Sequence, residues 1–149
     1  MNINSKRLQR HFEEMSQIGK IGDTGVCRPT LSPLEKEAFV LASSWMQEAG
    51  MQTHIDGFGN LIGRLEGTDP SLPVLMMGSH LDSQPYGGRF DGTAGVLAAI
   101  EVVMALKEKG IKPKRGIHVV SFADEEGWRF NKGLFGSRGI LTVSYTHLR

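Results

Sequence analysis

Two apolar segments of strand length, separated by one long helical segment, constrain the fold of this chain most strongly. Residues 73–78 form a continuous apolar run, which is typical of a strand covered on both faces of its sheet. A helix is predicted over about 92–109, ended by Gly110, and residues 117–123 repeat the buried-strand pattern. A strand, a long helix and a second strand make a βαβ crossover, which predicts two parallel strands in an α/β sheet.

The N-terminal third is predicted to contain two helices. Apolar residues recur at helical spacing over about 4–18 and predict an amphipathic first helix. For the second helix, Ser32 can cap the first turn, Pro33 suits the first helical position and Glu35 completes a capping box. This helix should run to Ala49, because the glycine that follows is suited to a left-handed stop.

The remaining segments complete the expected architecture. Residues 19–30 are rich in glycine and predict a loop, and residues 53–56 and 60–65 predict the two strands of a hairpin. A chain of 149 residues has the length of about one domain. The expected fold class is α/β.

The charge balance and the apolar pattern exclude several classes of partner. Lysine and arginine total 17 and aspartate and glutamate total 16, so the formal net charge is +1. Nucleic-acid and anionic lipid surfaces require a basic excess, so we expect neither partner. The longest apolar stretch, 94–106, is shorter than the about 20 residues of a membrane span. The only cysteine, Cys27, cannot form an internal disulfide, which favours a reduced, cytoplasmic setting.

Side chains that can bind a metal follow both strands of the predicted crossover. His80 and Asp82 come directly after the first strand, Glu125 and Glu126 follow the second, and Asp91 opens the helix between them. The carboxyl ends of parallel strands meet at one edge of the sheet, so these five side chains should lie close together. Crowded carboxylates raise one another's pKa, whereas a divalent cation removes that penalty. The sequence therefore predicts a metal site.

The residue types suggest roles within such a site. His80 offers an imidazole nitrogen to zinc, and Asp82, two residues on in an extended segment, could hold the other ring nitrogen. Asp91 could bridge two ions, while one of Glu125 and Glu126 binds metal and its neighbour acts as general base. Each residue alone also has a structural explanation: a strand-end histidine, a helix N-cap and a solvated pair of charges.

Three motifs in this region resemble those of one enzyme family. Residues 78–83 (Gly-Ser-His-Leu-Asp-Ser), 87–92 (Gly-Gly-Arg-Phe-Asp-Gly) and 124–130 (Asp-Glu-Glu-Gly-Trp-Arg-Phe) closely resemble the M20-type dinuclear metallohydrolases. The resemblance is to their carbamoylase-type amidase branch: N-carbamoyl-L-amino-acid hydrolases, β-ureidopropionases and allantoate amidohydrolases. It extends from residue 7 to about residue 141.

The resemblance implies a zinc-peptidase-like mixed sheet and two divalent metal ions, which could be zinc, manganese, cobalt or nickel. It implies that His80, Asp91 and Glu126 bind metal, with Asp91 as the bridging ligand. It also implies that Glu125 is the catalytic base and that Asp82 orients His80. The substrate would be a small N-carbamoyl amino acid or a related ureido acid.

The same resemblance implies that this chain is the N-terminal part of a longer protein, here called the parent. Family members carry two further metal-binding histidines and a lid domain for dimerisation, and these are absent from the sequence. We therefore expect residues 1–142 to be part of the catalytic domain and the parent to be a homodimer. Residues 143–149 resemble a translated transposon-end sequencing adapter, so we expect them to be non-native and do not count His147 as a ligand.

Three functions remain open at this point. The parent is expected to hydrolyse the non-peptide C–N bond of an N-carbamoyl amino acid or related ureido acid. An allantoate amidohydrolase would use the same machinery. The 149 residues by themselves could instead be a metal-binding fragment without activity, because their ligand set is incomplete.

Overall fold

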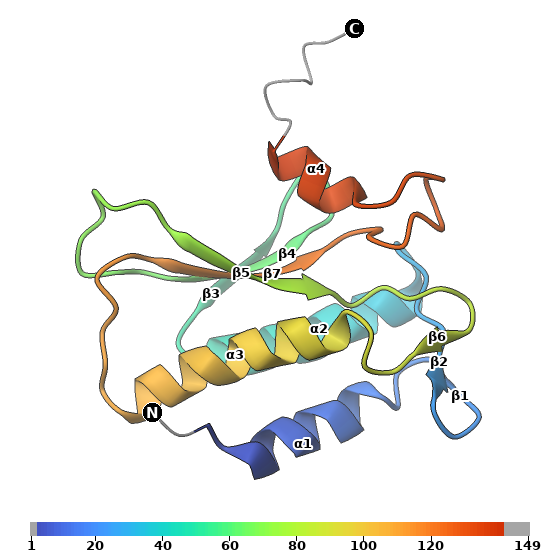
Figure 1. Ribbon diagram of the computed structural model, residues 1–149, viewed down its shortest axis with the longest axis horizontal. Coiled ribbons are helices and arrows are strands. Elements are labelled where there is room, and N and C mark those ends of the chain that lie inside the picture. The colour runs from blue at the N-terminus through green and yellow to red at the C-terminus, as the bar shows by residue number, and fades with distance from the viewer. Residues whose placement is uncertain (1–2, 142–149) are drawn as a thin grey trace, which may run out of the picture.

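In the computed structural model, which describes residues 3–141, helices lie on both faces of a mixed four-stranded sheet (Figure 1). Helices α2 and α3 pack on one face, α1 lies outside α3, and α4 contacts β7 from the opposite face. The elements are α1 (Ser5–Met15), β1 (Lys20–Ile21), β2 (Gly25–Val26), α2 (Pro33–Glu48), β3 (Gln52–Ile55), β4 (Leu61–Leu65), β5 (Leu75–His80), β6 (Gly87–Gly88), α3 (Thr93–Glu108), β7 (Ile117–Phe122) and α4 (Phe135–Leu141).

The main sheet confirms the predicted crossover and hairpin. Its strand order is β3-β4-β7-β5; β3, β4 and β7 pair antiparallel, and β5 runs parallel to β7. The register places Met77 opposite Val119 and His80 opposite Phe122. Both parallel strands therefore end at the same edge, so the residues that follow them are brought together.

The prediction that the first crossover strand is covered on both faces is wrong for its first half. Val74, Leu75 and Met76 keep 46%, 48% and 38% of their surface exposed. Within residues 3–141, β5 is an edge strand that pairs only with β7, so its apolar start lacks a neighbour on the other side. A continuous apolar run does not reveal whether a strand lies at the centre or the edge of a sheet.

The capping prediction for α2 is half confirmed. Ser32 is the N-cap and its hydroxyl accepts a hydrogen bond from Glu35 N. The Glu35 carboxylate does not return to the cap residue, as a capping box requires; it accepts from Leu31 N at 2.6 Å and from the Thr30 hydroxyl at 3.2 Å. Glu35 is buried beside the loop, and this burial raises its pKa to about 7.

A second small sheet occupies the segment that was predicted to be a loop. Strands β1 and β2 pair antiparallel, and β2 also pairs with β6, which places Gly25 opposite Gly88. Strands of two residues show no periodicity, so the sequence could not reveal them. The pairing holds the segment 19–30 against the loop that connects β5 to α3.

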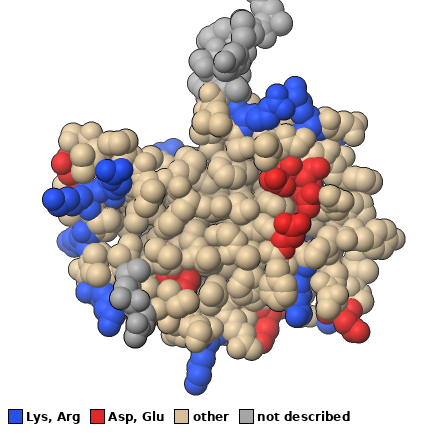
Figure 2. Space-filling view, viewed as in Figure 1, with Lys and Arg blue, Asp and Glu red and all other residues tan. Residues whose placement is uncertain are grey.

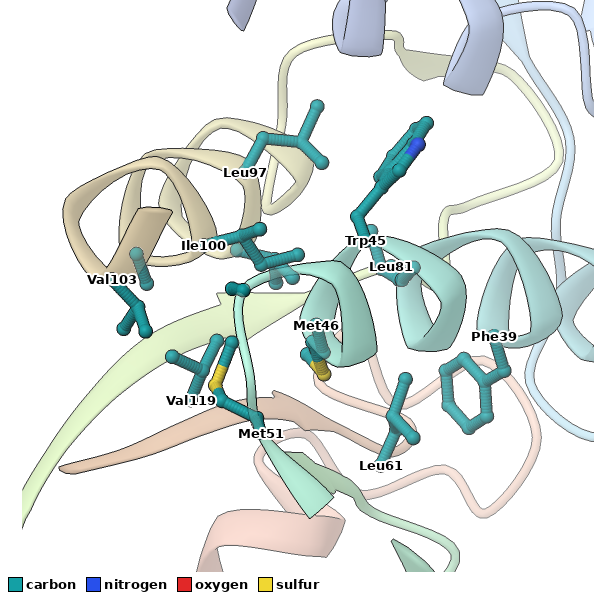
Figure 3. Packing of buried hydrophobic residues seen from close by; sticks show 14 of the residues in the cluster. Phe39, Trp45, Met46, Met51, Leu61, Leu81, Leu97, Ile100, Val103 and Val119 are labelled. Atoms are coloured by element: carbon teal, nitrogen blue, oxygen red, sulfur yellow. The ribbon is translucent and has the colours of Figure 1, made fainter. Parts of the chain in front are cut away.

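Apolar side chains from α2, α3 and the sheet form the core (Figure 3). Trp45 and Met46 come from α2, Ile100 from α3, Leu61 from β4 and Val119 from β7. None of the helices within residues 3–141 is both long and apolar enough to cross a membrane. Residues 143–149, including His147, lie outside the described residues.

One cation is buried beside this core. Arg28 is only 1% exposed, and its guanidinium donates hydrogen bonds to the carbonyl oxygens of Met15, Ile18 and Leu81 and to the hydroxyl of Thr93. Burial lowers its pKa to about 10, partly offset by the negative charge of nearby Asp82. Arg28 thus connects the end of α1, the residue after β5 and the start of α3.

A buried histidine joins α1 to α2. The ring of His11 stacks on Trp45, with 4.0 Å between ring centroids, and is fully buried. Neither ring nitrogen has a hydrogen-bond partner among the described residues. Burial, together with the positive charges of Arg10 and Arg7, lowers the pKa of His11 to about 4, while Glu101 acts in the opposite direction.

This burial makes stability depend on pH. The folded pKa of His11, about 4, lies below its ordinary value of 6.5, so the unfolded chain binds the proton first as the pH falls. We expect the contribution of neutral His11 to the free energy of unfolding to be present above pH 6.5 and to be lost progressively towards pH 4, by up to about 3 kcal/mol.

Replacing His11 by Phe keeps an aromatic ring stacked on Trp45 but removes the group that binds the proton. Urea unfolding of the parent at pH 7.5 and pH 5 should show a smaller loss of stability in His11→Phe than in the wild type; equal losses would contradict this account.

Candidate metal site

The predicted site lies at the edge where β5 and β7 end. His80 is the last residue of β5 and is buried, whereas Asp91 precedes α3 with an exposed side chain. The Nε2 atom of His80 lies 3.4 Å from Glu125 Oε2 and 3.8 Å from Asp91 Oδ1. The structure thus brings His80, Glu125 and Asp91 together from three separate segments.

The orientation of the His80 ring is fixed from both sides. Its Nδ1 atom lies 2.9 Å from the main-chain oxygen of Asp82. A carbonyl oxygen only accepts, so Nδ1 carries a hydrogen, and Nε2 is the ring nitrogen that faces Glu125 and Asp91. Gly92 packs on the other side: it has a φ of +62°, and a Cβ atom there would lie 2.5 Å from the ring. Position 92 therefore requires glycine.

Asp82 contacts the His80 ring through its main chain rather than through its carboxylate. Its carboxylate Oδ1 lies 3.6 Å from His80 Nδ1, too far for a hydrogen bond, while its carbonyl oxygen makes the bond. The carboxylate instead accepts long hydrogen bonds from Glu125 N, at 3.4 Å, and Glu126 N, at 3.5 Å. Asp82 therefore ties the end of β5 to the segment after β7.

The buried position of Asp82 has an electrostatic consequence. Burial raises the pKa of the Asp82 carboxyl above its usual range. The charge of His80 and the hydrogen bonds that the carboxylate accepts from Glu126 N and Glu125 N lower this pKa in part. Figure 2 shows one compact group of acidic side chains on this face of the molecule, with further acidic side chains lying separately and lysine and arginine side chains mostly towards the periphery. A cation bound near His80 would offset the repulsion between such carboxylates.

The two adjacent glutamates point in different directions. Glu125 faces His80, whereas the Glu126 carboxylate accepts a hydrogen bond from Gln84 Nε2 at 2.8 Å. Although Glu125 and Asp91 both lie within 4 Å of the His80 ring, no three His, Cys, Asp or Glu side chains in the part of the chain that the structure describes are arranged so that they could already hold a metal ion. The contacts of the Glu126 side chain thus differ from those of Glu125: its carboxylate is bonded to Gln84, while Glu125 lies beside His80.

The donor set still fits a divalent transition ion. Two ligands at about 2.0–2.1 Å from a tetrahedral ion lie about 3.3 Å apart. The distances from His80 Nε2 to Glu125 and Asp91, 3.4 Å and 3.8 Å, are within about half an ångström of that spacing. An imidazole nitrogen with its lone pair directed at carboxylate oxygens suits zinc and the neighbouring transition metals.

A residue that sequence reasoning missed, Asp124, shapes the loop after β7. It is fully buried, has a φ of +48°, and its carboxylate accepts from the N–H groups of Arg129 and Phe130 at 3.0 and 2.9 Å. Its own N–H donates to the Thr30 hydroxyl at 2.9 Å. An aspartate that opens a loop is a signal for local hydrogen bonding to the main chain, which the sequence offers at this position.

Asn60 supports the same loop from the hairpin and was also missed. Its side-chain oxygen accepts from Ala123 N at 2.9 Å, and its amide donates to Gly136 O at 3.1 Å and to the Asp56 carboxylate at 2.9 Å. Asn60 is fully buried, so its side chain serves as a fixed connection between the hairpin, β7 and α4.

Comparisons with known proteins show which family the chain belongs to. The model of Peptidase family M28 matches residues 60–148. An N-carbamoyl-L-amino-acid amidohydrolase from Pseudomonas sp. (strain NS671) is 52% identical, over 95% of this chain and 34% of the relative. Allantoate deiminase 1 of Glycine max is 38% identical, over 85% of this chain and 27% of the relative.

The solved structures show the same relationship. A hydantoinase/carbamoylase family amidase from Burkholderia ambifaria superposes with a TM-score of 0.88 at 40% identity, covering 91% of this chain and 34% of that structure. The chain thus spans about a third of the length of the relatives that it matches. The matching family model is numbered M28 rather than M20, while the amidase relatives are those that the motifs predicted. The chain belongs to Peptidase family M28, and its predicted resemblance to the carbamoylase-type amidases is confirmed.

Proposed function

We propose that the parent of this chain hydrolyses the C–N bond of N-carbamoyl amino acids or related ureido acids with two divalent metal ions. The observation that carries this proposal is the convergence of His80, Glu125 and Asp91 at the edge where β5 and β7 end. The similarity to an N-carbamoyl-L-amino-acid amidohydrolase along 95% of the chain supports the substrate class.

In this proposal His80, Asp91 and Glu126 would hold the metal ions. When bound, the ions supply Lewis-acid activation of the ureido carbonyl and of the attacking water. Glu125 accepts the proton of that water at its carboxylate and delivers it to the leaving nitrogen. Asp82 keeps His80 in the tautomer that presents Nε2, through the hydrogen bond to its carbonyl oxygen.

Several finer points belong to the same proposal. The ions are zinc, manganese, cobalt or nickel, since an imidazole and carboxylates suit this group of metals. The parent acts in the cytoplasm as a homodimer formed through a lid domain. Residues 1–142 form part of its catalytic domain, and residues 143–149 are a non-native, adapter-derived tail.

Allantoate is the second candidate substrate. The 38% identity to an allantoate deiminase supports it, and the same residues would act on that ureido acid. Turnover of N-carbamoyl amino acids, ureidopropionate and allantoate by the purified parent, measured as ammonia release, separates these candidates. The highest kcat/KM identifies the substrate class, and no turnover of any of them would overturn the proposal.

The first prediction concerns the metal. Treating the parent with a strong chelator should abolish activity, and zinc, manganese, cobalt or nickel should restore it. Magnesium is the control, because it prefers an all-oxygen site and His80 supplies nitrogen. Replacing His80 or Asp91 by Ala should lower the bound metal per protein, measured by elemental analysis. Chelator-resistant turnover would exclude a metal-dependent reaction.

The second prediction separates the adjacent glutamates. Glu125→Gln should retain metal and lower kcat by about 10²–10⁴-fold, because the proton acceptor is lost. Glu126→Gln should first lower metal content, with activity partly recovered in excess metal. Glu37→Gln, an exposed change on α2, is the matched control and should alter neither quantity. If the two phenotypes were exchanged, the roles of base and ligand assigned here would be reversed.

A further inference from the structure

Gln84 lies in the loop between β5 and β6, where its main chain is firmly held although its side chain is exposed. The Gln84 carbonyl oxygen accepts hydrogen bonds from the Ser83 hydroxyl at 2.9 Å and from Gly87 N at 3.2 Å. Ser83 is in turn paired with buried Arg28: Ser83 N donates to Arg28 O at 3.0 Å, and Arg28 N donates to the Ser83 hydroxyl at 2.9 Å. The main chain of Gln84 is therefore held in place by these hydrogen bonds.

The side chain of Gln84 extends from the loop after β5 to the segment after β7. Its amide Nε2 donates to Glu126 Oε2 at 2.8 Å, between residues 42 positions apart in the chain. Glu126 is also held at its main chain, since its N–H donates to Asp82 Oδ2. The loop after β5 thus contacts Glu126 at both ends of the residue, through Asp82 and through Gln84.

The chemistry of the contact suits a metal ligand. A carboxylate has two oxygens, and a hydrogen bond to one of them leaves the other available to an ion. The donor is a neutral amide, so it orients the carboxylate without adding a positive charge that would repel a cation. A lysine at this position would neutralise Glu126 instead.

We propose that Gln84 is a positioning residue for Glu126, holding Oε2 so that the second carboxylate oxygen is presented to a metal ion. This inference rests on the proposed function, in which Glu126 is a metal ligand. Gln84 does not touch the ion; it acts by restricting the rotamers of a long, half-buried glutamate. Residues that orient metal ligands in this way typically change metal affinity by about 10–100-fold when they are replaced.

The test measures metal binding directly. The parent is stripped with a chelator, and zinc is titrated back in competition with a chromophoric chelator. Gln84→Leu, which keeps the volume but not the donor, should weaken the binding of one of the two ions by about 10–100-fold. Gln84→Glu should weaken it at least as much, because an ionised carboxylate cannot donate and repels Glu126. Gln17→Leu, at an exposed glutamine near the end of α1, is the matched control and should bind zinc like the wild type.

Two readouts distinguish positioning from other roles. The kcat of Gln84→Leu should be low at limiting zinc and recover in excess zinc, with KM unchanged and with a thermal unfolding midpoint like that of the wild type. A raised KM with wild-type zinc affinity would instead place Gln84 in substrate binding and overturn the proposal. Wild-type zinc affinity in both Gln84 variants would also overturn it.

Glu126→Gln separates this failure from a failure of the proposed function. If Glu126→Gln loses zinc while both Gln84 variants retain it, the positioning role is wrong and the metal site stands. If Glu126→Gln also binds zinc like the wild type, Glu126 is not a ligand, and both the assigned metal site and the inference about Gln84 fall.

Discussion

The hydrogen bonds of one buried guanidinium hold the surroundings of the site together. Arg28 is almost completely withdrawn from water, and within residues 3–141 no carboxylate lies within ion-pair distance of it. Burying a charge in this way is costly, and the cost is offset by donors directed at three carbonyl oxygens and one hydroxyl. Because those acceptors belong to α1, the β5 loop and α3, the three segments are fixed relative to one another.

The site depends on this frame and on the strand register. Parallel pairing places His80 opposite Phe122, so the loops after β5 and β7 start side by side. The Asp82 carboxylate then joins the two loops by accepting hydrogen bonds from the N–H groups of Glu125 and Glu126. The adjacent glutamates consequently share one main-chain anchor but have different side-chain partners, which is the physical basis for giving them different roles.

Much of the fold was predictable because its signals are local. The cap at Ser32 and the glycine after Ala49 delimit α2 within one or two residues, and the apolar runs predict β5 and β7. Features that depend on distant partners were not predictable. The exposure of β5 depends on its place in the sheet, and the two-residue strands have no pattern of their own. Helix α4 carries two glycines, a composition that argues against a helix.

The same distinction applies to the site. His80, Asp82, Asp91 and the glutamate pair could be found because each lies at the end of a recognisable element. The bond that Asp82 makes through its carbonyl oxygen could not, since sequence identifies side chains and says nothing of main-chain acceptors. Gln84 could not be found either, because its partner Glu126 is 42 residues away and a glutamine in a loop does not indicate which carboxylate it contacts.

The stack of His11 on Trp45 also gives the chain two separate optical reporters. Trp45 is 4% exposed inside the helical layer, while the other tryptophan of the chain, Trp128, is 57% exposed in the loop after β7. A tryptophan shielded from water emits at shorter wavelength than one in contact with it, and a protonated imidazole in van der Waals contact quenches indole fluorescence. Emission at the blue edge of the spectrum therefore follows the docking of α1, and emission at the red edge follows the environment of the loop that carries the two glutamates.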